Sequence, residues 1–497
     1  MTQSSRPRDR TGGGERGGRP DATALLAVRF GLSAATTGNP RIATGDVPAW
    51  LERVRRHGGF AVSRIPFAAL DQWSFHPGTG NLGHSSGRFF TVEGLRVSGG
   101  DWGAGGFTQP VVNQPESGIL GILAREIDGV LHLLMQAKME PGNTGLVQLG
   151  PTVQATRSNY TRAHRGGPTR YLEHFTGPGR GRVLVDVLQS EQGDSFWHKR
   201  NRNMVVEVSG DIPVQDGHQW MTLGQVHALM GTAHLVNMDV RTVLSCLPLG
   251  GGETPGPDLP GTSGDISFHR ALARSLGPGA RAVHDELELL SWLTDLRTDS
   301  TVSAGLVPLR GLAGWRQDED AIAEESGTRL KVIAVSVRAG TREVTRWTQP
   351  MLEFPGQGVA AFVVKRIDGV LHILMQGKAQ PGIRDAVELA PTVQCVSRNW
   401  EEVPPRSRPP MLDHVLRAAR ARVRFDAVLP EEGGRFYHRD NRYLVVEADD
   451  DFPAAEPDTM RWATLNQLKT LMRYGTYVNV EARTLIACLQ SLWPGDR

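Results

Sequence analysis

The sequence predicts an α+β protein made of two tandem homologous domains, and three observations support this fold class. Residues 127–138 read IDGVLHLLMQAK and recur as IDGVLHILMQGK at 367–378. From 127 to 160, 19 of 34 positions are identical to those 240 residues later (367 − 127 = 240). In both copies strand-like segments come first and amphipathic helices follow. A Gly- and Pro-rich stretch separates the two copies. The long repeat indicates that one folding unit occurs twice in the chain.

The repeat and the composition together predict the domain boundaries. We expect a tail at 1–22, a first domain at 23–248, a linker at 249–264 and a second domain at 265–497. The N-terminal residues are rich in Arg, Gly and Ser without an apolar stretch, which is typical of a disordered tail and not of a secretory signal.

The first expected elements are a helix, a strand and a hairpin. Pro48 suits the first turn of an amphipathic helix at 47–54. Strand 89–97 is rich in β-branched and aromatic residues. The apolar segments 119–126 and 130–138 flank Asp128-Gly129, a pair that tolerates the positive φ angles of a hairpin turn.

Capping boxes then mark a helix in each half, one beginning with Thr222 and Gln225 and the other with Thr464 and Gln467. The remaining expected elements of the first half are strands at 152–160, 182–189 and 196–208, a short helix at 168–175 and a last helix at 238–247. In the second half they are strands at 330–338, 391–400, 422–428 and 436–448 and a closing helix at 481–489.

The composition excludes several classes of function. A net charge of +2 over 497 residues does not favour nucleic acid as a partner. No apolar run approaches the length that spans a bilayer, and three cysteines without metal-ligand spacing indicate a reducing compartment. Phosphate-loop, dinucleotide-binding and nucleophile-elbow motifs are absent. We therefore expect a cytoplasmic protein without a metal or cofactor.

Polar residues present in both halves are candidates for a shared ligand. Arg, Lys and amide side chains at the end of an apolar strand would suit an anion. The alternative is a solvated basic strand edge. The shared residues include Gln136 and Gln376, Lys138 and Lys378, Asn159 and Asn399, Asn201 and Asn441, and Arg202 and Arg442.

Residues that differ between the halves are better candidates for chemistry. Glu140 is replaced by Gln380 and Tyr160 by Trp400, so an acid/base set of Lys138, Glu140 and Tyr160 is possible only in the first half. Glu140 could instead be an exposed loop residue, and Trp400 either a base-stacking or a core aromatic. Two further candidates are Arg157 and Arg398, at neighbouring positions of the repeat. His198 lies among polar residues, where a functional role and a surface role are both open.

Three long motifs resemble the NDP-hexose 2,3-dehydratases of antibiotic deoxysugar pathways. They are 114–121 (QPESGILG), 134–143 (LMQAKMEPGN) and 151–160 (PTVQATRSNY), together with 200–204 (RNRNM). The resemblance covers about residues 25 to 493. It implies two Nudix-type domains, although the helices at 222–230 and 464–472 lack the glutamate-rich box that binds magnesium in Nudix hydrolases.

The resemblance also implies a reaction and its partners. The substrate would be dTDP-4-keto-6-deoxyglucose, which would lose water across C2 and C3 to give an unstable 3,4-diketo-2,6-dideoxy product. A 3-ketoreductase would consume that product, and the protein would be a homodimer. On this reaction we hypothesise Glu140 or His198 as the base, Tyr160 as the acid and Lys138 as the contact to the oxyanion or diphosphate. A nucleotide-sugar binding protein without turnover remains the alternative.

Overall fold

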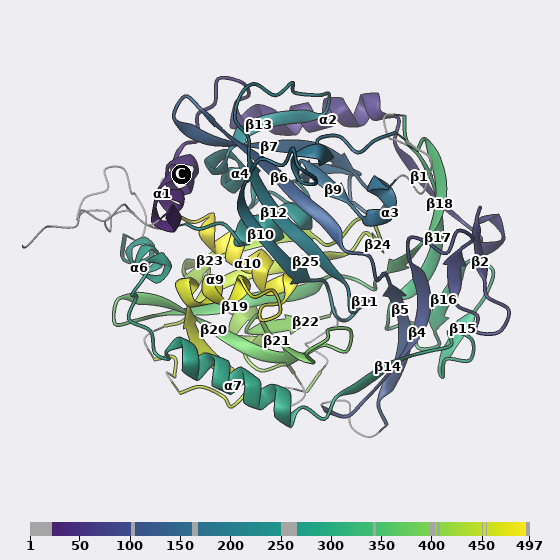
Figure 1. The fold of residues 1–497 in the computed structure, drawn as a ribbon. Helices are drawn as coiled ribbons and strands as arrows, with labels where there is room; N and C mark the ends of the chain where they lie inside the picture. The colour runs from purple at the N-terminus through teal and green to yellow at the C-terminus, as the bar shows by residue number, and fades with distance from the viewer. Residues whose placement is uncertain are drawn as a thin grey trace, which may run out of the picture.

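The computed structural model describes residues 22–100, 105–161, 167–249, 266–340, 344–396, 403–404, 408–449, 451–453 and 455–493. These residues form a mixed α+β fold in which each half of the chain builds one large sheet, and two smaller sheets lie beside them (Figure 1). The prediction of an α+β fold with two repeated units is confirmed. Residues 1–21 of the expected tail, and all but residue 249 of the expected linker, lie outside the described residues.

The first half contains, in order, α1 (Ala22–Ala35), α2 (Val47–Gly58), β1 (Ala61–Ile65), β2 (Trp73–Phe75), β3 (Leu82–His84), β4 (Thr91–Ser98), β5 (Phe107–Asn113), β6 (Gly118–Ile127), β7 (Val130–Met139), β8 (Val147–Gly150), β9 (Val153–Ala155), α3 (Arg157–Tyr160), β10 (Arg182–Ser190), β11 (Phe196–Trp197), β12 (Arg200–Glu207), β13 (His218–Thr222), α4 (Leu223–Leu229) and α5 (Met238–Ser245).

The second half contains α6 (Ile266–Leu276), α7 (Glu286–Asp299), β14 (Ser303–Val307), β15 (Trp315–Gln317), β16 (Ala321–Glu324), β17 (Lys331–Arg338), β18 (Arg346–Glu353), β19 (Gly358–Ile367), β20 (Val370–Ala379), β21 (Val387–Ala390), β22 (Val393–Cys395), α8 (Leu412–Leu416), β23 (Val423–Pro430), β24 (Phe436–Tyr437), β25 (Asp440–Glu447), β26 (Met460–Thr464), α9 (Leu465–Met472) and α10 (Val480–Gln490).

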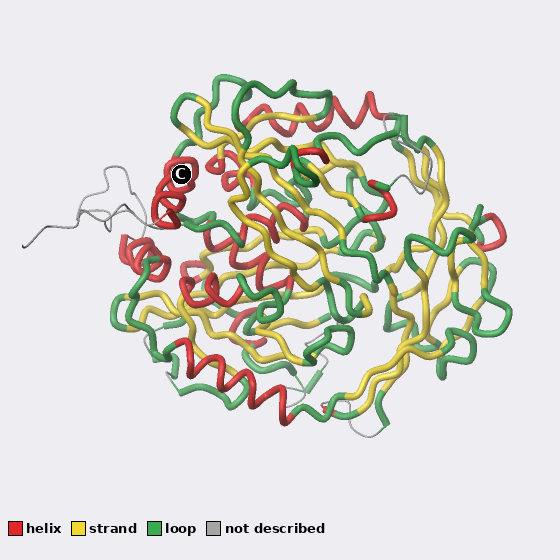
Figure 2. The backbone as a smooth tube through the Cα atoms, in the orientation of Figure 1, coloured by secondary structure: helices red, strands yellow, loops and turns green. Residues whose placement is uncertain are grey.

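Each large sheet is built by one half of the chain and has the same topology. The first has the order β10-β12-β6-β7-β13, with β8 added to β7 and β9 added to β6. The second repeats it with β23, β25, β19, β20 and β26, plus β21 and β22. Both contain one parallel pair, β12 with β6 and β25 with β19. The strands of both large sheets are seen in Figure 2.

The two small sheets exchange strands between the halves. β1 of the first half pairs with β17 of the second, and β14 of the second half pairs with β4 of the first. Their inner faces share one hydrophobic cluster, which includes Val92 and Val112 from the first half and Val332 and Leu352 from the second. Because each small sheet needs a strand from the other half, the halves are joined by backbone hydrogen bonds as well as by packing.

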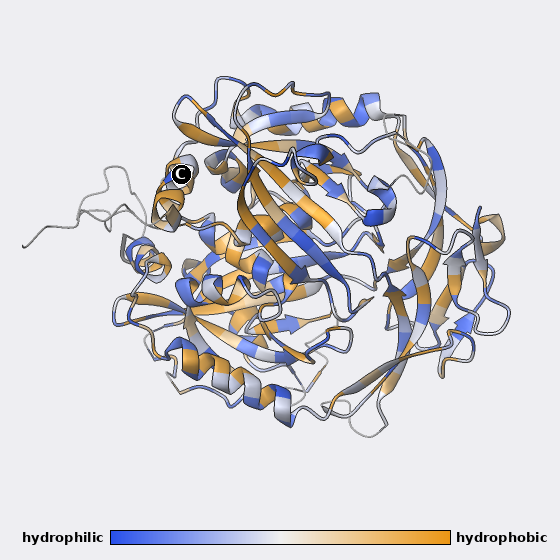
Figure 3. Ribbon diagram, in the orientation of Figure 1, coloured by the Kyte–Doolittle hydropathy of each residue, from blue (hydrophilic) through white to orange (hydrophobic). Residues whose placement is uncertain are grey.

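Two buried arginines join the large sheets at the centre of the molecule. α5 and α10 pack against each other, and the core around them contains residues of both halves. Figure 3 shows hydrophobic residues (orange) on the strands of both large sheets. Arg483 of α10 donates to the carbonyl of Ser190 at 2.5 Å, and Arg241 of α5 donates to the carbonyl of Pro430. Each guanidinium therefore satisfies a backbone carbonyl of the opposite half.

Most predicted elements are present, and several boundaries differ. Asp128 and Asp368 have φ angles of 51° and 50°, as the hairpin turns require, and both capping boxes form. The strand predicted at 152–160 ends at Ala155, and Arg157–Tyr160 form a helical turn. A helix was predicted at 168–175, but only Leu172–His174 form a short 3₁₀ turn.

The strand predicted at 196–208 is two strands in different sheets. β11 pairs with β5 and β12 with β6, and the break falls at His198, whose φ is 52°. Sequence analysis also missed the helices α1, α6 and α7. In the described part of the chain, no helix combines the length and the apolar character needed to cross a membrane.

Candidate active site

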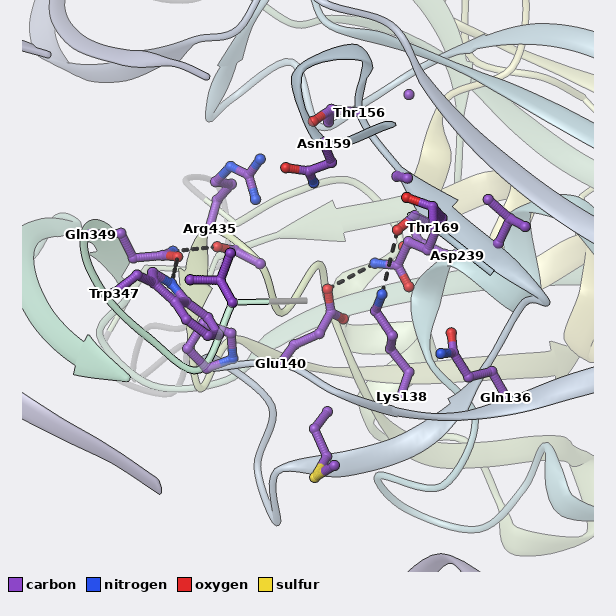
Figure 4. Close-up of a pocket in the computed structure, with 18 of the residues that line it drawn as sticks. Gln136, Lys138, Glu140, Thr156, Asn159, Thr169, Asp239, Trp347, Gln349 and Arg435 are labelled. Atoms are coloured by element: carbon purple, nitrogen blue, oxygen red, sulfur yellow. Dashed lines mark hydrogen bonds between the residues drawn. The ribbon is translucent and has the colours of Figure 1, made fainter. Parts of the chain in front are cut away.

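A cavity of about 1400 Å³ lies at the end of the first large sheet and is lined by residues of both halves. Its first-half wall comes from α2, β7, β9 and the start of α5, while β18 and the loop between β23 and β24 supply the second-half wall. In Figure 4, Lys138 and Asp239 lie on one side, Trp347, Gln349 and Arg435 on the other, and Glu140 between them. The cavity is therefore a composite of the two halves.

The end of β7 supplies Gln136, Lys138 and Glu140 to this cavity. Alternation along the strand places Gln136 and Lys138 on one face. Glu140 follows the strand and is buried, with its Oε1 accepting a 2.8 Å hydrogen bond from Gln154 Nε2. Lys138 Nζ donates to the carbonyl of Gln154 at 3.4 Å (Figure 4). Gln154 thus holds a carboxylate and an ammonium group side by side at the cavity wall.

The loop between β23 and β24 supplies Glu432, Gly434 and Arg435. The backbone N–H groups of Gly434 and Arg435 donate to Glu432 Oε1 and Oε2 at 3.1 and 2.7 Å. Gln349 Nε2 fixes the loop by donating to the carbonyl of Gly434 at 2.6 Å, and its Oε1 accepts from the Trp347 indole. The Glu432 carboxylate is therefore held in place by its own loop.

Buried charges surround the floor of the cavity. Asp239, in the first turn of α5, is buried, and burial together with Glu140, Glu191 and Glu432 raises its pKa well above the ordinary value. Burial also raises the pKa of Glu432 to about 7. Arg435 opposes this shift, whereas Glu140 and Glu191 add to it. A site with several carboxylates in a small buried volume can hold protons at neutral pH.

Lys199 is the buried cation of this site. Its ammonium group donates to the carbonyl of Glu116, and only 6% of the residue is exposed. Burial lowers its pKa to about 8, and the charge of Arg435 adds to the shift. Lys199 can therefore exchange its proton more readily than a surface lysine.

Loops of the two halves meet reciprocally at the edge of the cavity. The N–H of Gly142 donates to the carbonyl of Gly433, and the N–H of His438 donates to the carbonyl of Gly142 at 2.9 Å. The second half repeats both bonds, through Gly382 with the carbonyl of Gly193 and through His198 with that of Gly382. These contacts bring the β23–β24 loop of the second half into the first-half site. They also bring the β10–β11 loop of the first half into the second-half site.

The corresponding site of the second half has different chemistry. Gln380 stands at the position of Glu140, and Gln192, contributed by the first half, stands at the position of Glu432. Arg439 replaces Lys199 and is ion-paired with Asp194 at 2.7 Å, while Gly434 stands at the position of Asp194 in the first site. Glu140 and Glu432 thus have amide counterparts in the second site, and the Asp194–Arg439 ion pair fills the place left open by glycine.

The structure brings together some of the predicted site residues. Gln136, Lys138, Glu140, Asn159 and Asn201 line the cavity.

The remaining candidates of the first half lie elsewhere. Tyr160 packs against the neighbouring hydrophobic cluster, and Arg157 is exposed. His198 stacks on Trp197 outside the lining. Arg202 points to the other face of β12, where its guanidinium pairs with Asp186.

The second-half candidates follow the same pattern. Lys378 donates to the carbonyl of Gln394 at 3.2 Å, as Lys138 does to that of Gln154, and Gln376 occupies the same place on β20. Asn441 donates to Glu431, and Arg442 pairs with Asp426 on the outer face. Arg398, Asn399 and Trp400 lie outside the described residues.

Sequence analysis missed Lys199, Asp239, Glu432 and Arg435 as site residues. The change from Lys199 to Arg439 between the halves was a usable signal. Glu432 and Arg435 also differ from their counterparts Gln192 and Ser195, but a comparison of the halves does not reveal that their loops are exchanged and so does not place them in the first site. Within the ranges that the structure describes, no group of three or more His, Cys, Asp or Glu residues is placed to hold a metal ion.

Comparison with known proteins identifies related chains of similar length. The family model for NDP-hexose 2,3-dehydratase matches residues 44–247 and again 286–489. Two relatives carry the name dTDP-4-dehydro-6-deoxy-alpha-D-glucopyranose 2,3-dehydratase. The one from Saccharopolyspora spinosa is 49% identical over 94% of this chain and 95% of its own. The one from Amycolatopsis orientalis is 48% identical over 94% of both chains.

Proposed function

The chain belongs to the NDP-hexose 2,3-dehydratase family, and from this premise we propose that it removes water across C2 and C3 of dTDP-4-keto-6-deoxyglucose. The product is a 3,4-diketo-2,6-dideoxy sugar nucleotide, and the enzyme is a carbon–oxygen lyase. The observation that supports this proposal best is the composite cavity, in which Lys138 and Glu140 stand side by side.

Glu140 is the base in this proposal. The C4 ketone acidifies the proton on C3, and removing that proton creates an oxyanion at C4 that needs a cation or hydrogen-bond donor. Lys138 supplies the positive charge beside Glu140. His198 is the weaker candidate, because Glu140 lines the cavity and His198 does not. Gln136, Asn159 and Asn201 bind the nucleotide sugar from the same wall.

The second half keeps a binding role without catalysis. Gln376, Lys378 and Asn441 repeat the amide and cationic positions of the first half, whereas Glu140 and Glu432 are replaced by amides. Equilibrium dialysis with dTDP should therefore find two sites per chain. A single site would remove this part of the proposal.

Several wider expectations belong to the same proposal. Each half has a Nudix-type fold, with domains at 23–248 and 265–497. The protein acts as a homodimer in the cytoplasm, within antibiotic deoxysugar biosynthesis. Because a 3,4-diketo sugar is unstable, a 3-ketoreductase consumes the product.

The test is incubation of the purified protein with dTDP-4-keto-6-deoxyglucose, without added metal or nicotinamide, followed by mass spectrometry. We expect loss of one water from the sugar nucleotide, or release of dTDP from a decomposing diketo product, also in the presence of EDTA. Unchanged substrate with dTDP still bound would instead identify a nucleotide-sugar binding protein.

A further inference from the structure

We propose that Glu432, contributed by the second half of the chain, is the general acid that protonates the departing C2 hydroxyl in the first-half site. The inference rests on the proposed function and deepens it, because it assigns a partner to the base Glu140. It follows from three features of the structure: the shared position of the two carboxylates, the internal repeat and an unpaired oxygen of Glu191.

The first feature is the closeness of Glu432 to Glu140. Both line the cavity and both surround Gly434: a Cβ atom built at this residue would lie 2.5 Å from Glu432 Oε1 and 3.5 Å from Glu140 Oε1. Glycine at 434 therefore leaves the space between the two carboxylates open. One substrate can reach both groups there, which elimination across adjacent carbons requires.

The second feature is the difference between the two sites. At the second site the positions of Glu140 and Glu432 hold Gln380 and Gln192, which cannot act as acid or base. At the same site Asp194, which is ion-paired with Arg439, stands where the first site has Gly434. The two carboxylates and the open space between them therefore occur together at the first site.

The third feature indicates where a proton resides. In the second site, Gln192 Nε2 donates to Glu431 Oε2 at 2.9 Å. The corresponding oxygen in the first site, Glu191 Oε2, is buried and has no hydrogen-bond partner among the described residues, and Glu432 stands at the position of Gln192. A carboxyl can replace the amide as donor only when it is protonated. This arrangement favours a protonated Glu432 before the C2 hydroxyl departs.

The two carboxyl groups complete a balanced reaction. Glu140 takes the proton from C3, and the electron pair of that bond forms the enolate with the C4 carbonyl. The enolate then forms the C2–C3 double bond as the C2–O bond breaks, and Glu432 gives its proton to the departing hydroxyl, which leaves as water. Finally Glu432 takes the proton of the C3 enol hydroxyl and Glu140 returns its proton to C2. Both groups regain their starting state.

The test separates the two proton transfers in D₂O. In Glu432→Gln we expect the C3 proton of dTDP-4-keto-6-deoxyglucose to exchange with solvent at a rate within about threefold of wild type, while water loss falls by about 10² or more. In Glu140→Gln both exchange and water loss should disappear. Glu325→Gln, which changes an exposed carboxylate paired with Arg316, is the matched control and should behave as wild type.

A substrate that needs no acid keeps the inference falsifiable. Fluoride leaves without protonation more easily than hydroxide, so Glu432→Gln should release fluoride from the 2-deoxy-2-fluoro analogue at a rate within about tenfold of wild type. This rescue also shows that the variant is folded. Normal water loss in Glu432→Gln, or loss of C3 exchange together with water loss, would overturn the role of Glu432. Failure of the wild-type protein to lose water would instead reject the proposed function.

Discussion

Glu140 differs from its second-half counterpart Gln380 by one chemical group, and the proposed reaction depends on that group. We expect Glu140→Gln to lower kcat by a factor of about 10²–10⁴, the usual contribution of a positioned base. KM should change little, because the amide keeps the size of the side chain and can still pair with Gln154. Steady-state kinetics measure both parameters. Tyr160→Phe is the companion variant: an equal loss of kcat there would return the role of the acid to Tyr160 in place of Glu432.

The pH dependence of the rate tests the protonation of Glu432. An acid must carry its proton, so kcat/KM should fall as the pH rises above about 7, where Glu432 loses it. The charged groups that act on this carboxyl are Arg435 of its own loop and Glu140, Glu191, Lys199 and Asp239 of the first half. When Glu432→Gln acts on the 2-fluoro analogue, the fall of kcat/KM above about pH 7 should be absent. A fall near pH 7 that persists in this variant would assign the titration to another group.

The residues that sequence analysis found are those whose position depends on local structure. Alternation after the Asp128-Gly129 turn placed Gln136 and Lys138 on the cavity face, as the structure has them. Glu432 could not be found in this way. A comparison of the repeats pairs it with Gln192, whereas the exchange of loops places it beside Glu140. Long-range contacts of this kind have no sequence period to reveal them.

The loops after β7 and β20 depend on glycine because another loop lies against them. A Cβ atom at Gly142 would lie 1.6 Å from the carbonyl oxygen of Phe436, and one at Gly382 would lie 1.9 Å from that of Phe196. We expect Gly142→Ala and Gly382→Ala each to lower the free energy of unfolding by about 1–3 kcal/mol, as overpacked sites do. Gly231→Ala should be nearly neutral, because no atom of the described residues lies within 4 Å of a Cβ built there.

The two glycines should differ in their effect on turnover. Gly142 lies two residues from Glu140, so Gly142→Ala should lower the turnover of the folded enzyme as well as its stability. Gly382 lies at the second site, so Gly382→Ala should lower stability alone. Urea unfolding and steady-state kinetics on both variants test this difference. Equal stability of Gly142→Ala and wild type would mean that the loops do not meet in solution as they do here.

Strands were predicted well where one sheet contains the whole segment and poorly where the chain changes sheets. β10 was predicted almost to its ends, because the whole apolar segment pairs with one neighbouring strand, β12. The segment 196–208 was predicted as a single strand, yet β11 and β12 belong to different sheets. The positive φ of His198 separates them, and its N–H bonds to Gly382 of the other half. Only a tertiary contact determines that break.

The whole molecule should unfold as one unit although its sequence is a tandem repeat. β1 and β14 complete sheets of the opposite half, and Arg241 and Arg483 donate to carbonyls of the opposite half. Removing either half would leave these carbonyls and strand edges unpaired, which costs about 1–3 kcal/mol for each buried group. We therefore expect one transition in differential scanning calorimetry.

Cutting the chain between the halves gives a sharper test of this unity. A protease site inserted between residues 250 and 265 should, once cut, leave the halves associated in size-exclusion chromatography, with the thermal transition and the dehydration intact. Residues 22–249 expressed alone should lack a cooperative transition, because β4 loses β14 and the inner face of its sheet is exposed. Co-expression with residues 266–493 should restore the cooperative transition, because β14 can then pair with β4. It should also restore dehydration, because residues of both halves line the cavity. If the cut halves separated and each unfolded cooperatively, the repeat would be two independent domains, and Glu432 could not be held in the first-half site.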